Sequence, residues 1–420
     1  MKTFRAGFGL VCCASLALAL TLASDAAAAA PVVEAPAAAR AQSGAAAGFL
    51  YAQAVLLNGK TYEGRLRFDD EEAFWGDYFN SSKEPPAYLR DAPNRGGVHR
   101  VEKVLGIPLF DHTEEWGRQF VVRFGDLEKI EVSGGGRASV FLKGGMELEI
   151  RGGSNDLGGE IVIWDKAEGE TRIDWRKLRT LRFLPTPPSL TAAEKRFYGK
   201  LKTTTGELTG FIQWDQEECL STDVLSGNVR GKDRDVQLGE LKAIERQGDD
   251  SRFLFRDGHE EVLGGTNDVD DSNRGIWVDD ARFGRVLVNW DAFVRLDIED
   301  PPTSGPAYTD YGPTRPLEGK VKLKDGKVHQ GQIIYDLDEA YGWEMLDGQD
   351  GELEYSIPFG MVAKIKPAAD TAEVTLKNGQ KLHLGNTHDV DDGNAGLLVG
   401  NEIGKRVYLA WKDVDSIELD

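Results

Sequence analysis

An internal repeat constrains the fold of this 420-residue chain more than any other feature. Residues 267–276 read NDVDDSNRGI, and residues 388–397, which begin 121 positions later, read HDVDDGNAGL. A shortened form, NDL, stands at 155–157. Self-similarity at a fixed spacing indicates a fold that is built from repeated supersecondary units.

Two further patterns recur with this one. A glycine opens a short strand-like stretch that ends in an acidic residue, at 64–69, 210–215 and 331–336. Later in each copy a tryptophan is followed by apolar residues three and six positions on, at Trp175, Trp290 and Trp411. We therefore predict three tandem repeats of about 100 residues each. Their predicted bounds are 49–184 (with an insert at 82–116), 197–299 and 317–420.

Within a copy, two stretches begin alike. Residues 321–326 read VKLKDG and residues 374–379 read VTLKNG, so apolar and polar residues alternate up to an Asp-Gly or Asn-Gly pair. This pattern is a strong hairpin signal and predicts an all-β fold with about four or five short strands in each half. A brief helical step is expected just before the last strand, as at 411–419.

These strands resemble SH3-like or Sm-like small β-barrels, at the level of the fold and without a residue-specific family motif. The resemblance implies two small barrels in each repeat. A six-bladed β-propeller is the alternative, because six units of four strands would also fit. Pro-rich joints occur only between the pairs, at 185–188 and 301–316, which favours the barrels.

The N-terminus predicts export. Basic residues Lys2 and Arg5 precede an apolar run and small residues, which is typical of a cleaved signal peptide over 1–30. Residues 31–48 are rich in Ala and Pro and are expected to be a flexible linker. We therefore expect a periplasmic or secreted protein with no integral membrane segment in the mature chain.

The net charge limits the class of partner, and the cysteine content argues against a disulfide framework and a cysteine nucleophile. The net charge of −20 disfavours nucleic acid, including the RNA that many Sm-like proteins bind. Cys219 is the one cysteine expected in the mature chain, so no intramolecular disulfide framework is predicted. The adjacent Glu217 and Glu218 should raise the pKa of its thiol, which argues against a nucleophile.

The Asp-rich loops are the candidate metal sites. Several oxygen ligands on one short turn could bind calcium, the one cofactor that the sequence suggests. The EF-hand register fails, however, because placing Gly275 at the sixth position puts Arg274 at the fifth. The other interpretation is a turn in which Asn and Asp accept backbone N–H groups. The six candidate ligands are Asp268, Asp270, Asp271, Asp389, Asp391 and Asp392.

No catalytic motif stands out. The chain lacks nucleotide-binding and serine-hydrolase fingerprints, and His388 has His383 nearby but no further ligands for zinc. Carboxylate pairs such as Asp69 and Glu72 recur in every copy, which indicates a structural role rather than a single active site. An enzyme, such as a hydrolase of cell-wall polymers, is therefore the less favoured reading.

The insert at 82–116 is where the first copy departs most from the others. It combines prolines, a locally basic stretch and aromatic residues, and long insertions on β scaffolds often carry recognition. Its candidate binding residues are Tyr88, Arg95, Arg100, Phe110 and Trp116. The overall prediction is a non-enzymatic interaction or scaffolding protein of the cell envelope that binds protein or carbohydrate. A calcium-dependent binding module is the alternative.

Overall fold

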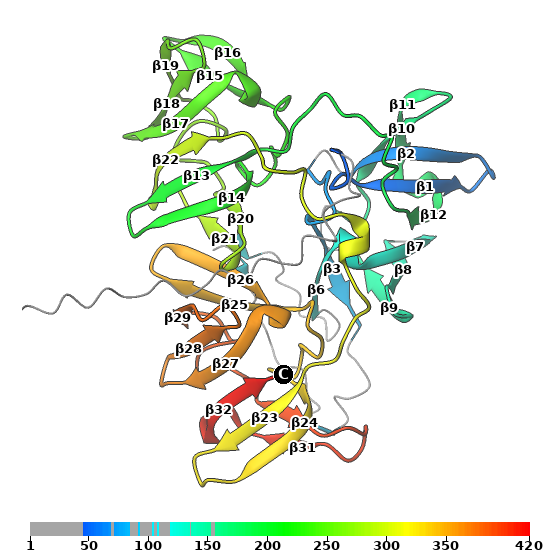
Figure 1. The fold of residues 1–420 in the computed structure, drawn as a ribbon, viewed down its shortest axis with the longest axis vertical. Coiled ribbons are helices and arrows are strands. Elements are labelled where there is room, and N and C mark those ends of the chain that lie inside the picture. The colour runs from blue at the N-terminus through cyan, green and yellow to red at the C-terminus, as the bar shows by residue number, and fades with distance from the viewer. Residues whose placement is uncertain are drawn as a thin grey trace, which may run out of the picture. The chain divides into compact units, whose positions relative to one another are not determined.

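The computed structural model describes residues 45–68, 71–84, 91–92, 103–104, 107–108, 118–134, 136–152 and 156–420. These residues form antiparallel β-sheets joined by turns and short 3₁₀ turns, with no α-helix among them (Figure 1). The all-β class is therefore confirmed. In the part of the chain that the structure describes, no helix has the length and apolar character needed to span a bilayer. The predicted signal peptide and residues 31–44 of the predicted linker lie outside the described residues.

The first segment, residues 45–184, contains one ten-stranded sheet with the order β11-β10-β2-β1-β12-β7-β8-β9-β3-β6. Strand β1 pairs with β2 and β12, β2 pairs with β10, and β12 connects this group to the remaining strands through β7. A separate two-stranded ladder joins β4 (Lys103–Val104) to β5 (Ile107–Pro108). The ten strands are β1 (Tyr51–Leu56), β2 (Thr61–Phe68), β3 (Tyr78–Lys83), β6 (Arg118–Arg123), β7 (Leu127–Gly134), β8 (Arg137–Leu142), β9 (Met146–Arg151), β10 (Glu160–Asp165), β11 (Gly169–Asp174) and β12 (Leu178–Phe183).

The second segment, residues 197–299, pairs its strands in the order β21-β20-β14-β13-β22-β17-β18-β19. Strands β15 and β16 form their own two-stranded ladder. The strands are β13 (Tyr198–Thr203), β14 (Glu207–Gln213), β15 (Val224–Val229), β16 (Lys232–Gln237), β17 (Leu241–Gln247), β18 (Asp250–Phe255), β19 (Glu260–Leu263), β20 (Ile276–Asp280), β21 (Gly284–Val288) and β22 (Phe293–Ile298).

The third segment, residues 317–420, has the order β31-β30-β24-β23-β32-β27-β28-β29-β25-β26. It joins the second segment through the ladder between β21 and β26, in which Arg285 pairs with Ser356. The strands are β23 (Glu318–Leu323), β24 (Val328–Ile334), β25 (Met345–Asp350), β26 (Leu353–Pro358), β27 (Val362–Pro367), β28 (Thr371–Leu376), β29 (Lys381–Gly385), β30 (Leu397–Val399), β31 (Val407–Leu409) and β32 (Val414–Leu419).

The pairing differs from the predicted barrels in two ways. The sheets are large and are not closed into barrels: in the described residues no ladder joins β6 to β11. The two halves of a segment are also interleaved, because β23 at the start of the third segment pairs with β32 at its end. Hairpin signals specify only neighbouring strands, so they could not reveal this long-range pairing.

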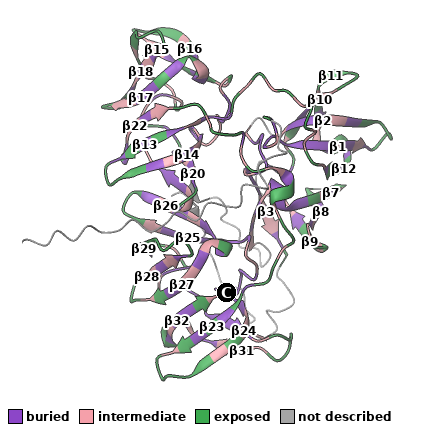
Figure 2. Ribbon diagram, viewed as in Figure 1, coloured by how far each residue is buried: buried purple, intermediate pink, exposed green. Residues whose placement is uncertain are grey.

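The strands are amphipathic, and their inward faces form the cores. Strand β28 alternates between buried and less buried residues along its length, as the colouring of Figure 2 shows for the sheets generally. The three expected tryptophans are buried, and two of them open 3₁₀ turns, η4 (Trp175–Lys177) and η8 (Trp411–Asp413), just before the last strand. The brief helical step is therefore confirmed at both places.

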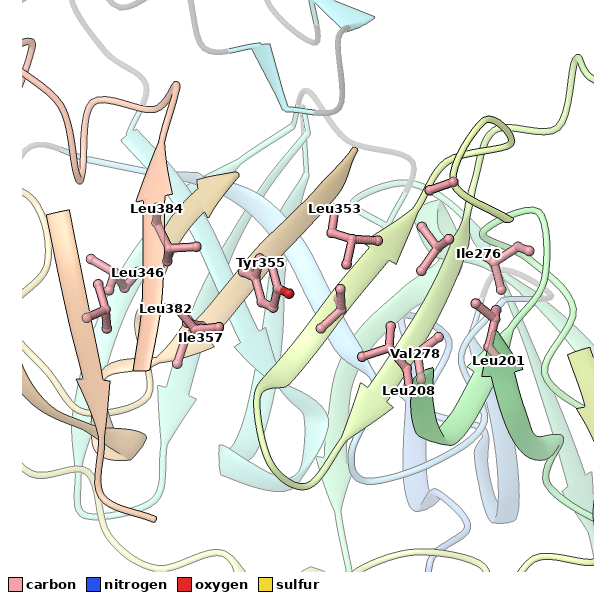
Figure 3. Close-up of a cluster of buried hydrophobic side chains, with 14 of the residues drawn as sticks. Leu201, Leu208, Ile276, Val278, Leu346, Leu353, Tyr355, Ile357, Leu382 and Leu384 are labelled. Atoms are coloured by element: carbon pink, nitrogen blue, oxygen red, sulfur yellow. The ribbon is translucent and has the colours of Figure 1, made fainter. Parts of the chain in front are cut away.

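One core cluster runs through the second and third segments. Figure 3 shows Val278 and Ile276 of β20 and Leu353 and Tyr355 of β26 among its members, drawn with their side chains. A second cluster fills the first segment around Phe68 and Phe124. Burial of this apolar surface is the main favourable contribution to folding.

Candidate functional site: recurring carboxylate clusters

A tight turn follows the second strand of every segment and presents acidic residues. The amide of the last apolar residue donates to the carbonyl of a glutamate four positions later: Phe68 to Glu72 (2.8 Å), Trp214 to Glu218 (2.8 Å) and Tyr335 to Glu339 (2.7 Å). In the second and third segments the turn contains consecutive left-handed residues, with φ of 48° at Asp215 and 46° at Asp336. Residues other than glycine rarely adopt this left-handed conformation, and it is found often at functional sites, where it fixes the direction of a side chain.

An aspartate from a distant connection reaches the same place in each segment. The amide of Asn80 donates to the carboxylate of Asp156, that of Ser226 to Asp268 (2.8 Å), and that of Asp347 to Asp389 (2.7 Å). One oxygen of each aspartate is thus bound to the backbone at the third strand of its segment.

The turn and the connection together create clusters of carboxylates. In the first segment, oxygens of Glu71, Glu72 and Asp156 lie within 4.8 Å of one another, and in the third those of Asp336, Glu339 and Asp389 do so. Hard cations prefer such an all-oxygen donor set. These two groups are therefore where the described part of the chain could hold a metal ion.

The second segment places an arginine in the corresponding cluster. Asp215, which is fully buried, accepts hydrogen bonds from the Arg274 amide (2.6 Å), Nε (3.0 Å) and Nη2 (2.7 Å). The Nη1 atom of Arg274 also donates to Glu217 at 2.9 Å. A positive charge of the chain itself is therefore bound among these carboxylates.

Burial dominates the electrostatics of the clusters. It raises the pKa of Glu72 well above its usual range, and the neighbouring Asp156, Glu71 and Asp77 raise it further. Burial together with Asp268 raises the pKa of Glu218 to about 9. Burial also raises the pKa of Asp215, although the bonds from Arg274 oppose this shift. Packed carboxylates favour a proton or a bound cation over a full set of negative charges.

An aromatic residue at the start of each turn packs beneath the cluster. Trp214 donates from Nε1 to the carbonyl of Asp268 at 2.7 Å, and the Tyr335 hydroxyl donates to the carbonyl of Asp389 at 2.5 Å. Phe68 holds the same position in the first segment but has no polar atom on its ring. The aromatic residue is therefore part of the core in every segment. In the second and third segments it also donates a hydrogen bond to the connection that carries the aspartate.

Two of the four remaining predicted metal ligands, Asp270 and Asp391, cap their own turns. Asp270 accepts the amides of Gly265 (2.9 Å) and Ser272 (3.0 Å), and Asp391 accepts the amide of Gly393 (2.8 Å). Asp271 and Asp392 are exposed. The structure thus separates the six predicted ligands, because only Asp268 and Asp389 point to the clusters described above.

Other predicted residues lie elsewhere. Cys219 is buried, its thiol donates to the carbonyl of Glu71 at 3.2 Å, and burial raises its pKa well above the usual range. Asp69 and the candidate binding residues Tyr88, Arg95, Arg100, Phe110 and Trp116 lie outside the described residues.

Sequence reasoning missed the role of Arg274. It counted this residue only as a break in the EF-hand register, whereas the structure shows it bound to Asp215 and Glu217. The available signal was the substitution between copies, since Ala395 stands at the matching position of the third segment. The amide of Ala395 donates to Asp336 just as that of Arg274 donates to Asp215.

A separate concave region of about 600 Å³ lies beside the joint that precedes the third segment. Its lining includes Arg123, Arg315, Lys377 and Trp343. Arg123 is already bound to Asp126 at 2.9 Å, so the region is less basic than its residue types suggest.

Comparison of the chain with protein-family models, with curated proteins and with solved structures gives no match.

Proposed function

We propose that this chain is an exported, non-enzymatic repeat protein that acts as an interaction or scaffolding module of the cell envelope. In this proposal it consists of three tandem copies of a unit with SH3-like strand connections, at 49–184, 197–299 and 317–420. The observation that supports it best is the threefold recurrence of one contact, in which Asp156, Asp268 and Asp389 each accept a backbone amide of the third strand.

Carboxylates that could act in acid–base catalysis form hydrogen bonds that hold turns of the fold. The Asp77 carboxylate accepts the amides of Ala73 and Phe74, both at 2.9 Å, and Asp223 accepts those of Cys219 and Leu220, also at 2.9 Å. A catalytic carboxylate needs a free oxygen next to a reacting atom. Groups that recur as turn caps favour a structural protein over a hydrolase.

Tandem units suit a binding array because linked weak contacts gain strength through effective concentration. We assign recognition to the insert at 82–116, since it is the largest departure of one copy from the others. Its basic and aromatic composition on a chain of net charge −20 would select an anionic protein or a carbohydrate.

The test uses the tagged full chain, expressed and fractionated with the cell envelope. A variant that replaces Tyr88, Arg95, Arg100, Phe110 and Trp116 by alanine should reach the same fraction but lose its cross-linked partners. A matched control replaces exposed apolar residues outside the insert, Leu57, Val262 and Val328, and should keep them. The proposal fails if the protein stays in the cytoplasm, or if the insert variant retains every partner.

A further inference from the structure

The cluster of Glu71, Glu72 and Asp156 contains an unsatisfied buried oxygen. The Glu72 residue is 4% exposed, and its Oε2 atom has no hydrogen-bond partner. Oxygens of Glu71 and Asp156 lie within 4.8 Å of one of its carboxylate oxygens and of each other. Burying an ionised carboxylate next to other carboxylates costs free energy of folding unless a cation or a proton compensates its charge.

The second segment shows a cation bound by one of the matching carboxylates. Glu217 precedes Glu218 as Glu71 precedes Glu72, and Glu217 is bound to Arg274 at 2.9 Å. Arg274 stands two residues before Ile276, which opens β20. The residue two before Ile161, its counterpart in β10, is Gly159, so no arginine side chain stands at that position of the first segment.

We propose that Glu71, Glu72 and Asp156 bind a calcium ion. The donor atoms are all oxygens, which excludes a preference for soft metals. Calcium binds six to eight oxygens at about 2.3–2.6 Å, so two ligands on opposite sides of the ion are about 5 Å apart, which the cluster satisfies. Magnesium keeps most of its water and requires shorter, octahedral contacts, which fits a buried three-carboxylate group less well.

This site differs from the Asp-rich loops that the sequence suggested. Asp270 and Asp391 are bound to amides of their own turns, whereas Glu72 belongs to the turn after β2 and meets Asp156 from a connection more than 80 residues away. The site is also independent of the proposed scaffolding role, since calcium binding is measured on the purified chain alone.

The experiment is isothermal titration of the full chain, freed of metal by a chelator, with CaCl2 as the probe. We expect calcium to bind, and Glu72→Gln to abolish one binding event per chain or weaken it by at least about tenfold. The matched control is Glu218→Gln, which alters the equivalent glutamate of the second segment, where the described carboxylates do not form a group of three within 4.8 Å, and which should bind calcium as the parent does.

Three results would overturn the proposal: no calcium binding by the parent, identical titrations of the parent and Glu72→Gln, or equally tight binding of MgCl2. If circular dichroism shows that Glu72→Gln does not fold, Glu71→Gln takes its place, because Glu71 is only half-buried. An unchanged calcium titration of a folded Glu71→Gln variant would equally count against the site. Calcium should also raise the melting temperature of the parent, and this rise should be absent in the variant.

Discussion

The carboxylate clusters of the first and second segments share one backbone frame but differ in the source of their positive charge. In the second, Arg274 lies among the carboxylates and contacts Asp215 and Glu217. In the first, Gly159 stands where the arginine would be. In both segments the equivalent glutamate, Glu72 or Glu218, has a buried oxygen without a hydrogen bond. The comparison shows that the same backbone arrangement forms with or without Arg274. Its buried carboxylates still require a cation or a proton to compensate their charge.

The largest expected effect comes from Arg274→Ala, which makes the second cluster resemble the first. Asp215 is fully buried, so losing the guanidinium leaves its charge poorly compensated. We expect a loss of about 3–5 kcal/mol in the free energy of unfolding, measured by urea denaturation. Arg295→Ala removes a more exposed pair with Asp297 and should cost at most about 1 kcal/mol. Equal losses in the two variants would break the comparison.

The next effect concerns pH. The folded pKa of Glu218 is about 9 and its ordinary value is 4.5, so the folded protein binds the proton more tightly than the unfolded chain does. Its contribution to stability is therefore complete below about pH 4.5 and is lost as the pH rises towards 9. Glutamine resembles the protonated acid, so Glu218→Gln should lose less stability than the parent between pH 5 and 8.

We expect this difference to be about 2 kcal/mol after allowance for partial exposure of the side chain. Urea denaturation at several pH values would measure it. Parallel pH profiles of the parent and Glu218→Gln would show that Glu218 is already ionised in the folded protein, which would break the prediction.

The smallest effect tests the aromatic position below the clusters. Tyr335→Phe gives the third segment the residue that the first has at Phe68, and it removes the bond to the Asp389 carbonyl. That carbonyl keeps a bond from Asn394 at 3.1 Å, so the loss should be about 1 kcal/mol by urea denaturation. Tyr198→Phe, which changes a partly exposed hydroxyl, is the control and should have almost no effect. A loss well above that of a single hydrogen bond would mean that the hydroxyl also orders the cluster.

The sequence allowed prediction of those features that depend on neighbouring residues. Alternation in stretches such as 374–379 predicted strands, and the tryptophan at 411 predicted the turn before the last strand. It did not allow prediction of the interleaved pairing, because the ladder between β23 and β32 joins residues about a hundred positions apart. The meeting of Glu72 with Asp156 depends on such pairing, and so the cluster remained hidden even though both of its halves carry conspicuous acidic residues.

The interleaving has a consequence for how the chain is made. Ala52 in β1 pairs with Phe183 in β12, so during synthesis the first strands of this segment emerge more than a hundred residues ahead of the strand that completes their pairing. Contacts of this separation form slowly because the entropy of closing the long loop must be overcome first. Each segment therefore stays open until its closing strand has left the ribosome, and a chain that ends within a segment leaves the edge of its opening hairpin exposed.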